Sequence, residues 1–172
     1  MTKDDSKEFE WKEVEEFLMK TRGIRREKKK LKELLKEFDK AYEIYRGFKG
    51  WLKTKESLRD VKLEQLLKGA ELTGVFTSAG EVSTRQIRKV FDEIKRLKIE
   101  LRTKGGEGVD LDRLLLLRPK LAYLEGKESR VRDYTGVMDI ILEKVKNHED
   151  LEKLADFSEA VVAYHKFYGG ND

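Results

Sequence analysis

The chain has 172 residues and a mass of 20.2 kDa, which fits a single domain with its own hydrophobic core. It contains no cysteine and two histidines, so disulfides, thiolate nucleophiles and cysteine-based metal sites are excluded. Charged residues make up 42% of the chain, and the longest aliphatic run, residues 114–117, is far shorter than the roughly 20 residues that a bilayer helix needs. We therefore expect a cytoplasmic protein with no membrane association, no metal and no cofactor.

Charge is segregated along the chain. Residues 20–62 contain sixteen Lys or Arg and seven Asp or Glu, residues 82–104 contain eight and three, and residues 118–133 contain five and three. Acidic segments separate these blocks, so the net charge is only +4. Such alternation is typical of a protein in which one surface meets phosphates while another faces protein partners. Solvated helix faces with paired charges give the same pattern, so this alternative stays open.

The residue composition also predicts the kind of organism from which the protein comes. Lysine and glutamate are abundant and cysteine is absent, as in proteins of hyperthermophiles. This predicts a thermophile protein, although basic RNA-binding helical proteins can have a similar composition.

The spacing of apolar residues predicts helix throughout. The only proline is Pro119, and no segment alternates β-branched residues with period two. We expect an all-α fold, a compact bundle of about five to six helices with one long basic amino-terminal helix. Residues 1–172 would form one domain, in which residues 1–78 supply the amino-terminal helices.

The long helix is predicted from residues 24–48. Apolar residues recur there at three- and four-residue steps, and Lys and Arg crowd the opposite face. Ser6 is expected to cap a shorter helix before it. A further helix is predicted to follow Ser57 and to break around Thr73, Gly74 and Gly80.

The clearest helix start is at Ser83. Ser83 and Gln86 have the spacing of a capping box, in which each side chain bonds a free backbone N–H of the other residue. This helix is predicted to end at the glycine-rich residues 105–108. A phosphate cradle there is disfavoured because Glu107 and Asp110 would repel phosphate, so we interpret the segment as a linker.

Beyond that linker, a leucine-rich helix meets Pro119, which either kinks it or opens a new helix. Two more helices are predicted at about residues 129–147 and 150–168. His148 falls in the turn between them and His165 on the last helix, and no Ser or Cys motif places a nucleophile beside either. The sequence therefore predicts no catalytic residues.

Two basic regions are candidates for nucleic-acid binding. Around Tyr42, Tyr45 and Trp51, aromatic and basic residues interleave, which suits base stacking, but helical spacing favours the core for both tyrosines and leaves Trp51 open. The helix from Ser83 carries arginine at its start, where a helix naturally binds phosphate. Its basic residues are Arg85, Arg88, Lys89, Arg96 and Arg102, and salt bridges to Asp92, Glu93 and Glu100 are the alternative.

Three segments carry a specific resemblance. They are VSTRQIRK at residues 82–89, continuing to Leu97, LRPKLAY at 117–123, and FSEAVVAYHKFYGG at 157–170. In this order and at these spacings, the segments resemble the small subunit of the Csm effector complex of type III-A CRISPR–Cas systems. The resemblance covers about residues 79–170 and leaves residues 1–78 uncovered.

The resemblance implies a non-catalytic, all-helical subunit in antiviral defence. Several copies would stack beside the backbone subunits and help to hold the duplex of CRISPR RNA and target RNA. RNA cleavage in such complexes resides in the backbone subunit, and DNA cleavage and cyclic oligoadenylate synthesis reside in the large polymerase-like subunit. The implied partners are therefore both RNAs, these two subunits and further copies of the chain itself.

The motif positions also indicate site residues. Arg85, Arg88 and Lys89 are the first candidates for contacts with the RNA backbone, followed by Arg118 and Lys120 beside the proline. A basic cluster adds Lys127, Arg130 and Arg132. The residues expected to pack the core or a neighbouring subunit are Tyr123, Ala160, Tyr164 and Tyr168.

Two other function classes remain open. A structural adaptor that binds only protein partners would explain the amphipathic helices but not the basic blocks. A helical DNA-binding regulator would also be small and basic, but the sequence contains no compact helix-turn-helix. Salt and sequence dependence of binding separate these classes from an RNA-backbone binder.

Overall fold

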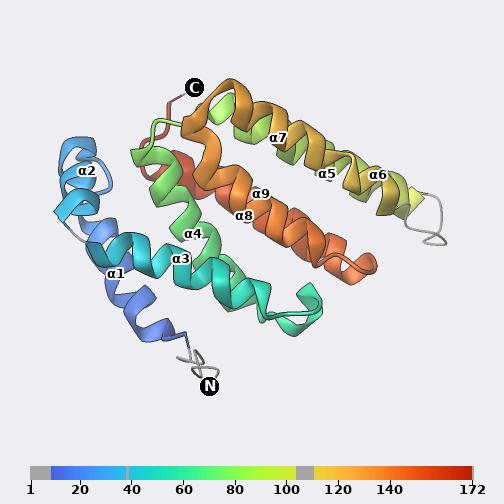
Figure 1. The fold of residues 1–172 in the computed structure, drawn as a ribbon, viewed down its shortest axis with the longest axis horizontal. Helices are drawn as coiled ribbons and strands as arrows, with labels where there is room; N and C mark the ends of the chain where they lie inside the picture. Colours follow the sequence, from blue (N-terminus) through green and yellow to red (C-terminus); the bar gives the residue numbers. More distant parts are fainter. Residues whose placement is uncertain (1–8, 38, 104–110, 172) are drawn as a thin grey trace, which may run out of the picture.

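A computed structural model of the chain describes residues 9–37, 39–103 and 111–171 (Figure 1). Within these ranges the regular structure is entirely helical, which confirms the all-α expectation. No helix in the described ranges is both long enough and apolar enough to cross a bilayer. The predicted Ser6 cap and the glycine-rich residues 105–108 lie outside the described residues.

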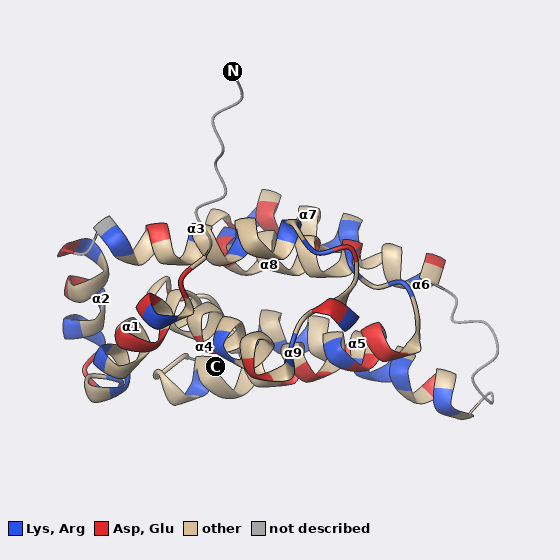
Figure 2. Cartoon of the chain, turned by 90° about the horizontal axis from the view of Figure 1, so that it is seen from below, with Lys and Arg blue, Asp and Glu red and all other residues tan. Residues whose placement is uncertain are grey.

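The helices form two layers that pack directly on each other, with α4 of one layer against α8 of the other, and α2 (Lys28–Glu37) lies at one end between them (Figure 2). In one layer α4 and α5 lie on either side of α9, and in the other α3 and α7 lie on either side of α8. The first layer contains α1 (Trp11–Gly23), α4 (Leu63–Ala79), α9 (His148–Phe167) and α5 (Thr84–Thr103). The second contains α3 (Asp39–Lys53), α8 (Arg132–Glu143), α7 (Leu117–Lys127) and α6 (Leu111–Leu115), and the short 3-10 turns are η1 (Leu58–Asp60) and η2 (Ser129–Val131).

Helix α4 is the centre of the bundle, and residues 69–78 within it are all buried. The break predicted at Thr73 and Gly74 is wrong, because the helix continues to Ala79 and ends at Gly80. Gly74 serves close packing instead. A Cβ at this position would lie 2.6 Å from the Cβ of Tyr164 on α9, so only glycine lets the two helices approach this closely.

The prediction of a single long amino-terminal helix is also wrong. The chain forms α2 and α3 as separate helices that contact each other, so the described ranges hold more and shorter helices than expected. Leu31 and Leu35 on α2 are buried against the body. A straight helix over residues 24–48 would carry one of its two apolar stretches into solvent, whereas two helices that run in different directions bury both (Figure 1).

Helix α5 begins at the predicted place but without the predicted cap. The Thr84 N–H and Oγ1 both donate to the backbone O of Asn171, so the carboxyl-terminal segment caps this helix. The Gln86 amide donates to Glu128 Oε2 at 3.2 Å and does not reach back to Ser83. The predicted capping box therefore does not form, because Thr84 and Gln86 bond to residues that are distant in the chain.

The later helices begin and end close to the residues predicted from the sequence. Pro119 opens a new helix, since it lies in the first turn of α7, where no backbone N–H partner is required. Helices α8 and α9 confirm the last two predicted helices. Asn147 caps α9 by accepting a hydrogen bond from the Asp150 N–H at 3.0 Å.

Candidate nucleic-acid interface

The solvent-facing side of α5 is a row of mostly basic side chains. Ile87, Val90 and Ile94 are buried on the opposite side of the helix, which packs against α9. The exposed row, called the α5 stripe, consists of Arg85, Arg88, Lys89, Asp92, Lys95, Arg96, Ile99 and Arg102. At 1.5 Å per residue, it extends about 25 Å along a helix that the core holds in place.

The first three basic residues of the α5 stripe are available for a ligand. Within the described part of the chain, Arg85, Arg88 and Lys89 form no hydrogen bond or ion pair through their side chains. At the far end, Arg102 pairs with Glu152 on α9 at 2.7 Å. The cations nearest the start of α5 are thus exposed and not neutralised by these described residues.

Glu93 and Glu100 on α5 point toward α7 and α6, because each pairs with a basic side chain there. Glu93 accepts from Lys120 at 2.7 Å, and Glu100 pairs with Arg113. Together with the Gln86–Glu128 bond, these contacts recur every seven residues along α5. Of the acids in the salt-bridge alternative, Glu93 thus pairs with α7 instead of the α5 stripe, and Asp92, itself part of the stripe, forms no ion pair within the described ranges.

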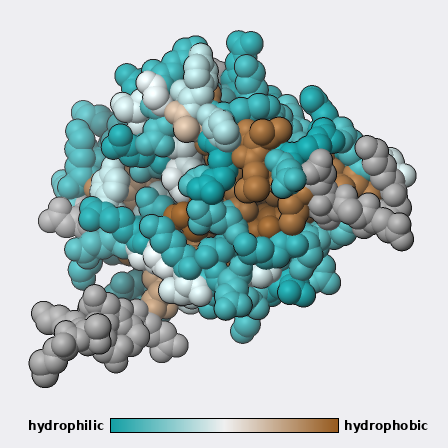
Figure 3. All heavy atoms as spheres, turned by 45° about the vertical axis from the view of Figure 1, so that its right-hand side comes forward, coloured by the Kyte–Doolittle hydropathy of each residue, from teal (hydrophilic) through white to brown (hydrophobic). Residues whose placement is uncertain are grey.

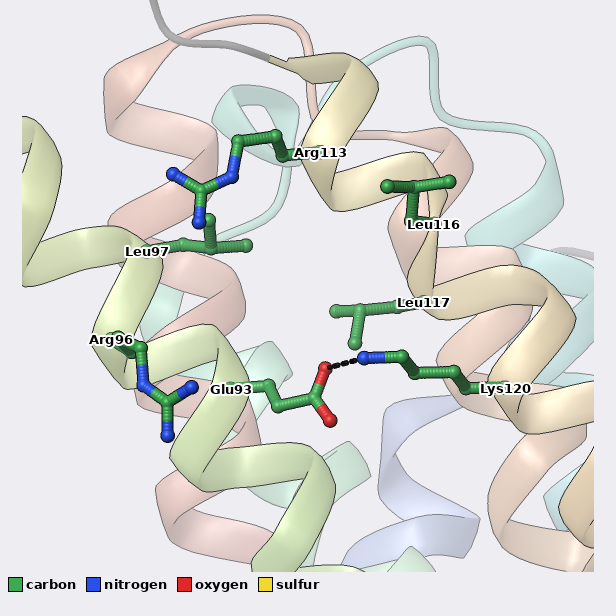
Figure 4. Close-up of a pocket in the computed structure, with 7 residues that line it drawn as sticks. All are labelled: Glu93, Arg96, Leu97, Arg113, Leu116, Leu117 and Lys120. Carbon is green, nitrogen blue, oxygen red and sulfur yellow. Dashed lines mark hydrogen bonds and ion pairs between the residues drawn. The ribbon is translucent and has the colours of Figure 1, made fainter.

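A small hollow lies within this bridged region between α5 and the α6–α7 segment (Figure 4). Leu97, Leu116 and Leu117 contribute apolar side chains, and the Glu93–Lys120 ion pair borders them. Lys120 thus points toward α5 and is already engaged with a carboxylate.

Arg118 points away from α5, toward α8. Its Nε and Nη2 donate to the two Asp139 carboxylate oxygens at 2.7 and 3.0 Å, and Nη2 also donates to Glu143 at 2.8 Å. These carboxylates hold the pKa of the Arg118 guanidinium above its usual range. The structure therefore separates Arg118 from Lys120 and neutralises both.

The basic cluster from the end of α7 to the start of α8 lies beside the start of α5. Glu128 contacts Gln86, so the residues on either side of Glu128 adjoin the first turn of α5. Arg132 pairs with Glu125 at 3.1 Å, and Arg130 Nη1 lies 3.9 Å from Glu81 Oε2. Lys127 has no side-chain partner among the described residues.

Two further cations lie near this site but were not predicted from the sequence as site residues. Lys28 and Lys32 on α2 lie 3.8 and 2.9 Å from the same Glu81 carboxylate that Arg130 approaches. The signal for them was the dense basic block at residues 20–62. The two lysines reach the turn before α5 because α2 runs in a different direction from α3 (Figure 1), which the helical periodicity did not predict.

The aromatic residues of α3 mostly belong to the core. Tyr45 is buried and stacks on Phe76, and Tyr42, which is 42% exposed, packs against the same ring. Trp51 meets Trp11 edge to face at 5.0 Å between ring centroids. These contacts favour packing over base stacking for this cluster.

The four tyrosine and alanine residues expected to pack the core or a neighbouring subunit differ in how deeply they are buried. Tyr168 is buried, and Ala160 and Tyr164 are partly buried against the core, as expected. Tyr123 is 69% exposed, so its assignment to this chain's core is wrong and a neighbouring subunit stays a prediction. Burial lowers the pKa of His165 to about 4, and its Nδ1 is hydrogen-bonded to Thr77.

Comparison with known proteins identifies the family. The family model described as Csm2 type III-A matches residues 60–171, and thus also covers α4, which precedes the motifs quoted above. The chain is 32% identical to "CRISPR system Cms protein Csm2" of Streptococcus thermophilus over 93 residues, which are 53% of this chain and 76% of that protein. The chain therefore belongs to the Csm2 family and is a small subunit of a type III-A Csm complex.

Proposed function

We propose that this subunit binds the backbone of the CRISPR RNA and its target through the α5 stripe. The observation that carries the proposal is that Arg85, Arg88 and Lys89 are exposed, have no counter-charge among the described residues, and lie on a helix packed against α9. Lys and Arg contacts to phosphates position a nucleic acid without reading its bases. The subunit would hold the RNA duplex by shape and charge, while base pairing supplies sequence specificity.

The other predicted cations take different parts in this proposal. Lys127 and Arg130 extend the surface at the start of α5, and Arg132 would exchange Glu125 for a phosphate. Arg118 and Lys120 are paired with carboxylates in the free subunit, so they would bind RNA only after those pairs open. First contact is therefore assigned to Arg85, Arg88 and Lys89.

The proposal assigns the subunit no catalytic step of its own. It would act within the complex beside the backbone subunit and the large polymerase-like subunit, in several copies. The surface offers apolar area for such protein contacts, and Figure 3 shows hydrophobic residues gathered on the face that it views. On α6, on α7 and between them, the exposed large apolar side chains are those of Leu115, Leu116 and Tyr123.

The direct test is binding of labelled single-stranded RNA and of an RNA duplex to the full chain by fluorescence anisotropy. Binding should be indifferent to sequence and weaken steeply between about 50 and 200 mM salt. Changing Arg85, Arg88 and Lys89 together to Ala should reduce the slope of log K against log salt by about 2, since each phosphate contact contributes roughly 0.7 for single strands.

A variant with the same charge change provides the matched control. Lys12, Arg59 and Lys146 are exposed, and their replacement by Ala removes three positive charges from other helices and loops. This control should retain most of the affinity. Equal losses in both variants would show that only net charge matters, and absence of RNA binding at low salt would support the adaptor function. The same measurement on two unrelated DNA duplexes tests the remaining class, since discrimination between them would indicate a regulator.

A further inference from the structure

The turn between α4 and α5 holds a carboxylate inside a group of cations. Glu81 Oε1 lies 2.9 Å from Nζ of Lys32 and 3.8 Å from Nζ of Lys28, and its Oε2 lies 3.9 Å from Nη1 of Arg130. The two lysines belong to α2, outside residues 60–171 that match the family model. Three elements therefore meet at one acidic side chain.

The backbone keeps Glu81 in this position. Its φ is 60°, the left-handed region that glycine usually occupies, and no other non-glycine residue in the described ranges has a positive φ. The Glu81 N–H donates to Ser78 O at 3.1 Å, and the Val82 N–H donates to Thr77 O at 3.0 Å. The turn thus holds an unfavourable backbone conformation and presents the carboxylate to α2.

The charges at this point do not balance. Three cations surround one carboxylate, and they hold the pKa of Glu81 below its usual range, so the group is ionised at neutral pH. The side chains remain partly open to water, with 42% of Glu81 and 62% of Arg130 exposed. An excess of positive charge is therefore accessible to a second anion.

The position of this group relates it to the α5 stripe. Glu81 precedes Thr84, the first residue of α5, by three residues, and Arg130 follows Glu128, which contacts Gln86 in the first turn of α5. A phosphate accepts hydrogen bonds from lysine and arginine as a carboxylate does. A nucleic-acid strand lying along the start of the α5 stripe can thus continue onto Lys28, Lys32 and Arg130.

We propose that Lys28, Lys32 and Arg130 form a binding site for an RNA phosphate, and that Glu81 occupies this site when RNA is absent. This inference rests on the proposed RNA-binding function and extends it to α2. The carboxylate competes with the phosphate, so it lowers the affinity of the free subunit for RNA. Binding of the strand displaces Glu81 from the three cations.

The test compares Glu81→Gln with Glu33→Gln in RNA anisotropy measurements at 50 mM salt. Both changes remove one negative charge, and Glu33 is exposed on α2 itself. Glu81→Gln should raise the affinity about three- to tenfold, whereas Glu33→Gln should change it little. In a chain that also carries Lys28→Ala, Lys32→Ala and Arg130→Ala, the gain from Glu81→Gln should disappear.

Each outcome is informative. Equal effects of Glu81→Gln and Glu33→Gln, or a gain that persists without the three cations, would overturn the inference while the triple α5 variant still tests the proposed function. If the α5 variant retains full affinity but Glu81→Gln raises it, the phosphate site stands and the α5 assignment falls. If neither the parent nor Glu81→Gln binds RNA at low salt, both fail. Glu81→Gly, which relieves the positive φ, serves as a second variant that folds without the carboxylate.

Discussion

The guanidinium of Arg22 and the carboxylate of Glu71 form a double hydrogen bond, with Nε–Oε1 and Nη2–Oε2 distances of 2.7 Å each. Glu71 is buried in the middle of α4, and the Tyr168 hydroxyl donates to its Oε1 at 2.8 Å. Glu71 and Tyr168 lie within the residues that match the family model, whereas Arg22 lies outside them. Helix α1 therefore supplies the counter-charge for a buried acid of the family region.

Replacement of Arg22 by Ala should lower the free energy of unfolding by about 2–4 kcal/mol, because it leaves a buried carboxylate without its cation. Urea denaturation at pH 7 measures the change. Arg26→Ala, which removes an exposed arginine just beyond α1, should change stability by less than about 0.5 kcal/mol. Adding Glu71→Gln to Arg22→Ala should recover part of the loss. No recovery would mean that Arg22 acts through packing and not through charge.

Acid should destabilise the chain through His165. Its pKa in the folded chain is about 4, lowered by burial first and then by Lys166 and Lys28, against about 6.5 when unfolded. Because the folded pKa is the lower one, its contribution to stability is complete above pH 6.5 and is lost as pH falls toward 4. The loss should reach up to about 3 kcal/mol, measured by urea denaturation across this range. His165→Asn should flatten the profile, and an unchanged profile would assign the pH dependence to carboxylates.

Close packing of α4 on α9 should make Gly74 sensitive to one added methyl group. Gly74→Ala should cost about 2–3 kcal/mol, since the new Cβ would meet the Tyr164 Cβ at 2.6 Å and the His165 backbone N at 2.9 Å. Gly136→Ala in α8 is the matched control, because nothing lies within 4 Å of its Cβ position. That change should stabilise the chain by about 0.5–1 kcal/mol. Similar thermal melting of both variants would contradict this account of α4.

The buried Asp150 should be the strongest single support of the loop before α4. It accepts hydrogen bonds from the Ser57 hydroxyl at 2.6 Å and from the backbone N–H groups of Arg59 and Lys146 at 2.9 and 2.8 Å. Asp150→Ala removes the acceptor of the Ser57 hydroxyl and of the Lys146 N–H, and leaves the Arg59 N–H only its longer bond to Ser57 Oγ at 3.4 Å. The change should cost about 3 kcal/mol in chemical denaturation. Asp156→Ala, an exposed change on the same helix, should be nearly neutral. A loss below about 1 kcal/mol for Asp150→Ala would mean that water replaces the carboxylate.

The sequence by itself determined the helical class, most of the later helix boundaries and the basic exposed face of α5. These properties depend on local periodicity, on Pro119 and on Asn147, and each acts within one or two turns of its own residue. The motifs around residues 82–97, 117–123 and 157–170 also sufficed to identify the family, because they combine residue types at fixed spacings.

Only the tertiary structure decided which cations are free and which are paired. Arg85 and Arg118 look alike in sequence, but Arg118 meets Asp139 and Glu143 on α8, whereas Arg85 meets no carboxylate among the described residues. The same holds for Gly74, whose small size fits α9 instead of ending α4. Lys32 reaches Glu81 because α2 turns back on the body. Such partners are distant in the chain, so no local pattern encodes them; packing of the buried faces brings them together.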